Sequence, residues 1–352
     1  MKSTKQQNLL RPVAFFALVA IIILTVCFAA SGYNEETSTD GIQPTPEQGE
    51  EESEPTVAPM PEYFDRLTGI PTTEDRANVS EVALVLNSTD PLFGVKGSKV
   101  TIEIPTESGG TRLVVHLEKD LLPGKIGSLS PTRGYISSLS LAFSGLLVSY
   151  GNDSILGGKD NPSCFDMSSV SGYSYTEYTT YHYTNADLVT AGIRNLSLSD
   201  KTSGALPYTF VKYGEDIRHS QRAARLTVSY SDINTTDLIY SGEDGEYTLF
   251  KNGNASIDLL NGRALTYKNV FLLFCDSVTY ETSEYTEMIL NTDSGGKGLY
   301  LTNGTYQEIV WFRSDEGELV FTTPEGELLQ INRGTSFISI AKSSEGKSIT
   351  II

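Results

Sequence analysis

The sequence predicts an α+β protein, in which a mixed α/β domain at residues 63–220 precedes a mainly-β domain at residues 221–352. Two observations lead to this prediction. In the first region, apolar segments rich in β-branched residues are followed by segments with the apolar spacing of helices. After Arg225, helix signals disappear and short alternating strands follow one another between glycine turns.

The first region opens with three predicted strands, at residues 82–87, 99–105 and 111–118, which are β-branched and bounded by turn residues. Residues 130–151 begin with Ser-Pro-Thr, carry apolar residues at helical spacing and end in Leu-Leu-Val-Ser-Tyr, which predicts a helix followed by a strand. A second helix is predicted at residues 185–197, with Asn185 as its N-terminal cap. This order favours a mixed α/β layer over a regular parallel repeat.

The second region reads as a sandwich, barrel or meander. Its predicted strands include ARLTVSYS, GEYTLFKNG, YKNVFLLFCD, KGLYLTNGTYQEIVWF and TSFISIA. Asn252-Gly253, Asn303-Gly304 and Glu325-Gly326 supply the positive φ angles that tight hairpin turns require.

Residues 12–30 form an uncharged apolar run behind a basic tail, residues 1–11, that carries two lysines and an arginine. The run reaches the length of about 20 residues that a membrane-spanning helix needs, which favours an uncleaved anchor with its basic end in the cytoplasm. Lipidation at Cys27 and signal-peptide cleavage near Ala30 are the two alternatives. All three place the rest of the chain at or beyond the outer face of the cytoplasmic membrane.

Residues 31–62 are predicted to be a disordered, self-repelling tether. The stretch from Tyr33 to Glu62 contains nine acidic residues and no Lys or Arg. Its formal charge of −9 is half of the formal net charge of −18 of the whole chain. No basic face is apparent elsewhere in the chain, which argues against a nucleic-acid partner.

Cysteine and histidine usage predicts neither a metal site nor a cofactor. Outside the apolar run, Cys164 and Cys275 either pair or remain as two free thiols, and the apolar surroundings of Cys275 favour free thiols. Neither has a second Cys or a His at the spacing of zinc ligands.

Several segments, in a fixed order over residues 64–342, resemble the YerB-like family of predicted lipoproteins of Gram-positive bacteria. The N-terminal segments that carry the resemblance are FDRLTGIP, VALVLNS, KVTIEIPTESGGTRLVVHL, KIGSLSPTRGYI and LGGKD. The C-terminal segments are ARLTVSYS, YSGEDGEYTLFKNGNASID, YKNVFLLF, GGKGLYLTNGTYQEIVWF and GELLQINRGTSFISIA. The resemblance implies a two-domain extracytoplasmic protein of a bacterium, from a family without an established activity.

The chain departs from the family pattern at positions that would bear on a ligand. Ser128 stands where the family has proline, and Ser130 stands where it has an arginine, whereas Arg133 keeps its second arginine. A family His-Asn pair appears as Thr184-Asn185, so the asparagine is retained without the histidine. The resemblance therefore makes Arg133 and Asn185 ligand-binding candidates in a divergent member.

Polar residues at strand ends suggest an anion site. Glu103 ends one predicted strand and Arg112 begins the next, so we expect Glu103, Arg112 and Arg133 to converge at one end of the sheet. Arginine suits carboxylate and phosphate groups because its planar fork donates two parallel hydrogen bonds. The alternative is a structural ion pair between Glu103 and Arg112 that joins neighbouring strands.

A second candidate surface is the tyrosine-rich stretch at residues 165–185, which includes Tyr173, Tyr175 and Tyr178. Tyrosine offers a large rigid contact area with a polar tip, which suits recognition of sugars, peptides or proteins. The same composition also suits a covering strand or loop with a structural role.

Catalytic signatures are missing from the sequence: it has no G-x-S-x-G elbow, no H-E-x-x-H motif and no serine–lysine motif with the usual companions. His116 lies in an alternating strand and is expected to be a packed or a surface residue of that strand rather than a general base. The sequence thus favours a membrane-tethered binding or assembly module for a cell-wall polymer or envelope protein over an enzyme. The alternative is a wall-directed hydrolase with carboxylates in the cleft between the domains, for example Glu103 with Asp166.

Overall fold

The computed structural model describes residues 60–151, 163–199, 201, 204–281, 286–343 and 348–352. Residues 59–352 group into one compact unit. Within the described part of this unit, strands greatly outnumber helices, and the two α-helices are α2 (Gly134–Ser140) and α3 (Ala186–Asn195). Short 3-10 helices also occur in the described residues, among them η1 (Glu74–Arg76), η2 (Glu107–Gly109) and η3 (Lys119–Leu121).

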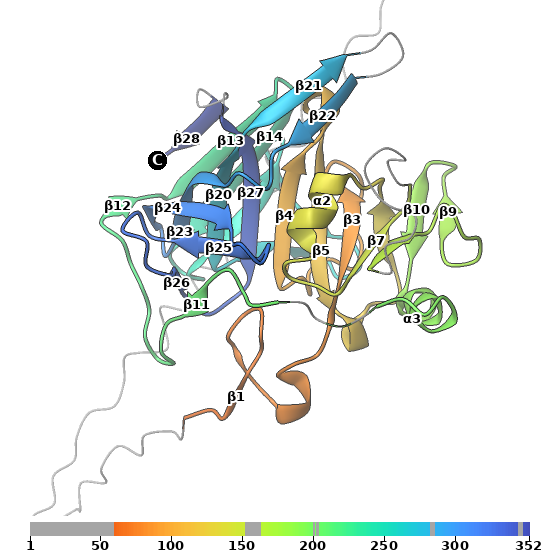
Figure 1. Ribbon diagram of the computed structural model, residues 1–352, viewed down its shortest axis with the longest axis horizontal. Coiled ribbons are helices and arrows are strands. Elements are labelled where there is room, and N and C mark those ends of the chain that lie inside the picture. The colour runs from red at the N-terminus through yellow and green to blue at the C-terminus, as the bar shows by residue number, and fades with distance from the viewer. Residues whose placement is uncertain (1–59, 152–162, 200, 202–203, 282–285, 344–347) are drawn as a thin grey trace, which may run out of the picture. The chain divides into compact units, whose positions relative to one another are not determined.

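A fourteen-stranded sheet dominates the described residues (Figure 1). Its main path runs β12 (Gln221–Arg222), β24 (Thr305–Arg313), β23 (Gly296–Thr302), β20 (Asn269–Cys275), β27 (Ser336–Lys342), β4 (Val100–Pro105), β5 (Thr111–Glu118), β3 (Glu81–Asn87), β6 (Ile126–Leu129), β10 (Tyr181–Thr184) and β9 (Tyr175–Glu177). Beside this path, β25 (Leu319–Thr322) pairs with β24, β7 (Leu146–Ser149) pairs with β3, and β8 (Cys164–Asp166) pairs with β7.

The remaining strands form one six-stranded sheet and four two-stranded sheets. The six-stranded sheet consists of β16 (Asn254–Ala255), β15 (Glu246–Lys251), β14 (Asn234–Ser241), β13 (Arg225–Ser231), β28 (Ile349–Ile351) and β19 (Thr266–Tyr267), which pairs with β15. The two-stranded sheets pair β1 (Tyr63–Phe64) with β2 (Pro71–Thr72), β11 (Thr209–Phe210) with β26 (Gln330–Ile331), β17 (Ile257–Asp258) with β18 (Arg263–Ala264), and β21 (Ser277–Glu281) with β22 (Thr286–Leu290).

The large sheet joins the N-terminal and C-terminal halves of the chain. β27 lies parallel to β4 in the register Ser336↔Val100, so backbone hydrogen bonds link two segments more than 200 residues apart. The same strand lies parallel to β20 on its other side. The domain boundary expected near residue 220 stays a prediction, and the sheet runs across it.

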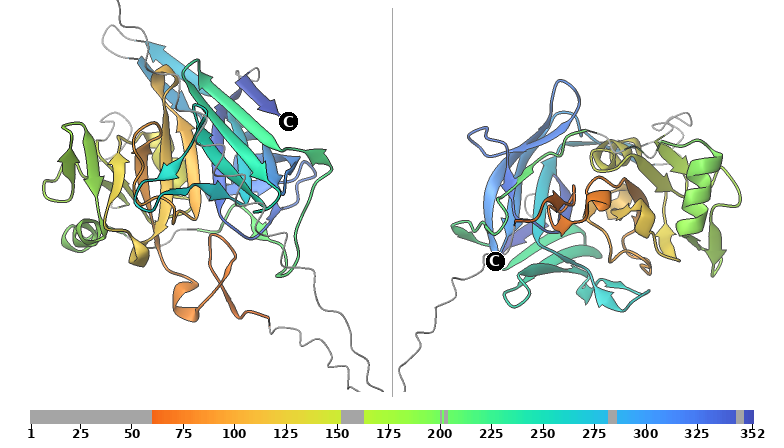
Figure 2. Two further views of the ribbon diagram at one scale, coloured as in Figure 1. Left: turned by 180° about the vertical axis from the view of Figure 1, so that it is seen from behind. Right: turned by 90° about the horizontal axis from the view of Figure 1, so that it is seen from below.

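Side-chain alternation along these strands builds a hydrophobic core on each face of the large sheet. On one face, Leu113 and Val115 of β5 pack with Leu226 and Leu249 of the six-stranded sheet. On the other face, Val114 packs in a second cluster that includes Tyr135 and Leu139 of α2 and Trp311 of β24. Figure 1 shows α2 in front of β4 and β5, and the view from behind in Figure 2 shows the strands of the six-stranded sheet across the opposite face.

The strand predictions and both helix predictions are confirmed in outline, and the mainly-β C-terminal region is confirmed. The Asn185 side chain accepts a hydrogen bond from the Leu188 N–H at 3.0 Å and thus caps α3, as its position predicted. A mixed α/β layer in the N-terminal region is not confirmed. Strands β6, β8, β9 and β10 were not predicted from the sequence. They add strands to this region and leave its two helices as minor elements.

Candidate functional site

Arg112 lies on β5 on the same face of the large sheet as α2, because its neighbour Val114 packs in the core beneath that helix. The guanidinium donates a long hydrogen bond of 3.4 Å to the Thr111 carbonyl oxygen. Its Nε atom is buried and has no hydrogen-bond partner among the described residues. Among the described residues Arg112 forms no ion pair, although the charges of Glu107 and Asp90 act on it from beyond ion-pair distance.

The cation that acts on the Arg112 guanidinium is Arg133, which immediately precedes α2. Arg133 is paired: its Nε and Nη2 atoms donate to the two carboxylate oxygens of Glu107 at 3.1 and 3.2 Å. Glu107 belongs to η2, the turn that connects β4 to β5. Burial raises the pKa of Glu107, but the bonds and charge of Arg133 outweigh burial and hold the pKa below its usual value.

The surroundings of Arg112 lower the pKa of its guanidinium, first through burial and next through repulsion from Arg133. Glu107 and Asp90 oppose this shift at longer range. Asp90 itself has a pKa raised by burial, with Ser128 and Arg112 acting in the opposite direction. The result is a partly exposed guanidinium beside a second arginine, and this arrangement suits an incoming carboxylate or phosphate.

Glu103 does not join this group, and the expected convergence of Glu103 with Arg112 is therefore wrong. Ile102 and Ile104 pack on the α2 face of β4, so alternation turns Glu103 to the opposite face. There the buried Glu103 carboxylate contacts the Lys251 ammonium of β15 and accepts a hydrogen bond from the Thr111 hydroxyl at 2.8 Å. The alternative ion pair between Glu103 and Arg112 is also excluded by this geometry.

The same topology separates the two carboxylates suggested for a hydrolase. Asp166 lies on β8, and β5, β3 and β7 lie between β8 and the strand of Glu103. Four strand spacings amount to roughly 19 Å, whereas glycosidase carboxylates lie about 5–9.5 Å apart. Asp166 instead accepts hydrogen bonds from the backbone N–H groups of Gly151 and Ser168 at 2.8 and 2.9 Å.

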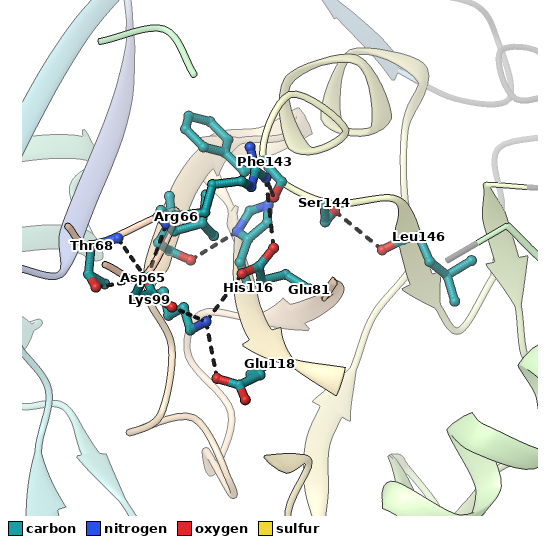
Figure 3. A network of polar contacts seen from close by, with 12 residues as sticks. Asp65, Arg66, Thr68, Glu81, Lys99, His116, Glu118, Phe143, Ser144 and Leu146 are labelled. Atoms are coloured by element: carbon teal, nitrogen blue, oxygen red, sulfur yellow. Dashed lines mark hydrogen bonds and ion pairs between the residues drawn. The ribbon is translucent and has the colours of Figure 1, made fainter. Parts of the chain in front are cut away.

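A charged network that the sequence analysis did not predict surrounds Lys99 (Figure 3). The Lys99 ammonium lies 2.5 Å from Asp65, 3.2 Å from Glu81 and 3.1 Å from Glu118. Arg66 completes it by donating to the Phe143 carbonyl oxygen at 2.8 Å. Burial raises the pKa of Glu81, and the charges of Lys99 and Arg66 oppose that shift.

This network ties the first described segment of the chain to the large sheet, because Asp65 and Arg66 precede β2 whereas Glu81 and Lys99 lie on or beside β3 and β4. Its cations and carboxylates pair with one another, which indicates a structural role. A pocket of about 320 Å³ lies beside it, with Arg76, Lys99 and Glu118 in its lining. The sequence feature that could have indicated this network is the segment Phe-Asp-Arg-Leu-Thr-Gly, in which a charged pair follows an aromatic residue and precedes a leucine.

His116 takes the packed position, one of the two that its alternating strand allows. Its ring is fully buried, with Nδ1 at 2.9 Å from the Val100 carbonyl oxygen and Nε2 at 3.1 Å from that of Ser140. Burial lowers the pKa of His116 to about 4, although both carbonyls act to raise it. A neutral imidazole has one N–H and can donate to only one of the two carbonyls.

The tyrosine-rich stretch forms the β9–β10 hairpin at one edge of the large sheet. The Tyr173 ring packs edge-on against Phe165, and Tyr175 contacts the ring of Tyr183. Tyr178 is 82% exposed at the hairpin turn and has a φ of +53°. Tyr173 and Tyr175 thus serve packing in part, and Tyr178 alone of these three projects into solvent.

The other predicted candidates lie elsewhere. Asn185 uses its amide oxygen to cap α3. Cys164 and Cys275 are both free thiols, the second of them buried. Cys27 and the apolar run at residues 12–30 lie outside the described residues. No group of three or more potential metal ligands occurs in the part of the chain that the structure describes. Among the helices of that part, none has the length and apolar character to cross a membrane.

Comparisons with known proteins agree with this fold. Residues 226–338 match the model of a family described as a protein of unknown function (DUF3048), C-terminal domain. The crystal structure of the YerB protein from Bacillus subtilis is similar, with a TM-score of 0.69 and 20% sequence identity, over 82% of this chain and 99% of that chain. The curated proteins gave no match. The chain therefore has the fold of the YerB protein, and its residues 226–338 are similar to the DUF3048 C-terminal domain.

Proposed function

We propose that this protein is a binding module of the bacterial cell envelope, held at the outer face of the cytoplasmic membrane, which recognises an anionic group of a wall polymer through Arg112. Residues 12–30 provide the membrane attachment, and the acidic stretch from Tyr33 to Glu62 acts as a spacer. Envelope polymers that carry phosphate or carboxylate groups are the ligand class.

The observation that carries this proposal is the unpaired charge of Arg112. Burying a cation without a counter-ion costs free energy, and the second arginine beside it adds repulsion. Proteins commonly relieve this cost with a carboxylate. Among the described residues Glu107 is bound by Arg133, and Asp90 acts on Arg112 without forming an ion pair with it. A bound phosphate or carboxylate would supply the missing negative charge.

The test is a thermal-shift and calorimetric titration of the full-length chain with poly(glycerol phosphate), muropeptides and inorganic phosphate. We expect one of the polymer fragments to raise the melting temperature, because a ligand at a hundredfold excess over its Kd stabilises the native state by about 2.7 kcal/mol. Arg112→Ala should abolish the shift. Arg112→Lys should retain only a part of it, because lysine cannot donate two parallel bonds.

Arg222→Ala is the matched control, because Arg222 is an exposed arginine on β12, at the far edge of the large sheet. Its binding should equal that of the native chain. An equal shift in Arg112→Ala and the native chain would place the anion elsewhere. A flat response of the native chain to every fragment would overturn the small-ligand proposal and leave a protein partner as the explanation.

A further inference from the structure

Two buried polar atoms without hydrogen-bond partners among the described residues line the same pocket. These are Nε2 of His219 and Oγ1 of Thr323. The pocket has a volume of about 530 Å³ and also has Gln307, Glu327 and Gln330 in its lining. This volume lies within the range of about 300–1,000 Å³ that is usual for small-molecule sites.

The fold holds these side chains on separate, well-connected elements. The parallel pair β11–β26 places Gln330 beside Thr209, and β24 contributes Gln307. The turn that carries Thr323 and Glu327 is closed by a hydrogen bond of 2.8 Å from the Thr323 N–H to the Glu327 carbonyl oxygen.

His219 is fixed from two directions. Its backbone N–H donates to the Thr305 hydroxyl at 2.9 Å, and its ring packs edge-on against Tyr300 with centroids 5.4 Å apart. These contacts hold the imidazole against the pocket without using Nε2. The orientation of the His219 ring is therefore set by its backbone hydrogen bond and by ring packing, so Nε2 can contact a ligand.

The chemistry of the lining selects among ligand classes. Hydroxyl, amide and neutral imidazole groups can both donate and accept hydrogen bonds, and such groups dominate the polar lining. Burial lowers the pKa of His219, which keeps the ring neutral at pH 7. Glu327 is the single charged side chain of the lining, so an anionic ligand would meet repulsion.

A sugar hydroxyl also both donates and accepts, whereas an ammonium group only donates. The apolar side chains of Ile217 and Leu328 lie in the lining of the same pocket and offer a surface for the C–H groups of a pyranose ring. We propose that this pocket is a binding site for a neutral saccharide unit, in which His219 and Thr323 hydrogen-bond its hydroxyl groups.

This site is separate from the Arg112 site. Five strand spacings separate β24 from β5 in the large sheet, or roughly 24 Å. The saccharide proposal therefore does not rest on anion binding, and each can fail without the other.

The test is isothermal titration calorimetry of the full-length chain with two neutral probes, chitotetraose and maltotetraose. We expect at least one to bind. Thr323→Val keeps the shape of the side chain and removes its hydroxyl, and His219→Phe keeps the ring and removes Nε2. Each variant should weaken binding of that probe at least tenfold. Thr248→Val, on β15 and outside the pocket, is the matched control and should bind as the native chain does.

Melting temperatures of the free variants guard against loss of the fold. Thr323→Val should melt at or above the temperature of the native chain, because it removes a buried hydroxyl without a partner. Absence of binding of both oligosaccharides to the native chain would overturn the proposal. Unchanged affinity in a folded Thr323→Val and a folded His219→Phe would overturn it as well.

Discussion

The Lys251 ammonium contacts the Glu103 carboxylate, so a cation of the six-stranded sheet neutralises a carboxylate of the fourteen-stranded sheet. Both groups are largely removed from solvent, with side-chain exposures of 11% and 1%. Lys251 also donates to the Thr236 hydroxyl at 2.8 Å. The ion pair of Lys251 and Glu103 thus links the two sheets.

Lys251→Met should therefore lower the free energy of unfolding by about 3–5 kcal/mol, because it leaves the Glu103 charge buried without a partner. The double variant with Glu103→Gln should recover a large part of this loss, since the carboxylate charge is then absent. Urea denaturation of both single variants and the double variant measures the coupling. Additive effects would contradict a direct pair.

Stability should fall on acidification because His116 is buried in its neutral form. The pKa of His116 is lowered by burial to about 4, below the usual value of about 6.5 in an unfolded chain. The unfolded state thus binds a proton first as the pH falls. The stability is fully present above pH 6.5 and is lost between pH 6.5 and 4, by about 3 kcal/mol in total.

The measurement is urea denaturation of the native chain and of His116→Gln between pH 7 and pH 4. The difference in stability loss between the two chains is the contribution of the histidine. The comparison is needed because Glu81 acts in the opposite sense: burial raises its pKa, so its proton uptake favours the native state at low pH. A native chain that loses no more stability than His116→Gln over this window would show that the ring is not the titrating group.

The sequence was sufficient for elements defined by local patterns. The Asn185 cap of α3, the strands around Val85 and Val114, and the turns at Asn252 and Asn303 follow from residue type and spacing alone. Both asparagines have positive φ angles, of 51° in each case. Local energetics fixes such features, so no knowledge of distant segments is needed.

The candidate site was predicted less well, because its partners come from distant segments. Arg112 and Arg133 do interact, but the partner of Glu103 is Lys251, which is 148 residues away. The alternation of β4 and β5 would have placed Glu103 and Arg112 on opposite faces only once their register was known. The pocket of His219 and Thr323 has no recognisable sequence motif, because its lining residues come from four separate segments of the chain.

The two neighbouring arginines should differ in their contribution to stability. Arg112→Met should leave the free energy of unfolding unchanged or raise it by about 1 kcal/mol, because the partly buried guanidinium forms no ion pair among the described residues. Arg133→Met should lower it by about 1–3 kcal/mol, because the two charge-assisted bonds to Glu107 are lost. Chemical denaturation without added ligand distinguishes them, and an equal loss in both would indicate that Arg112 is paired after all.

Gly192 in α3 should not tolerate alanine, although alanine in a helix is normally favoured over glycine by about 1 kcal/mol. A Cβ atom at this position would lie 2.5 Å from Cε1 of the Phe165 ring on β8, where the helix packs against the sheet. We expect Gly192→Ala to lower the melting temperature, because overpacking costs about 1–3 kcal/mol and exceeds the gain in helix propensity. The second substitution Phe165→Leu should restore part of the loss if the clash with this ring is its cause. A Gly192→Ala variant that is more stable than the native chain would show that the helix can move away from Phe165 at little cost.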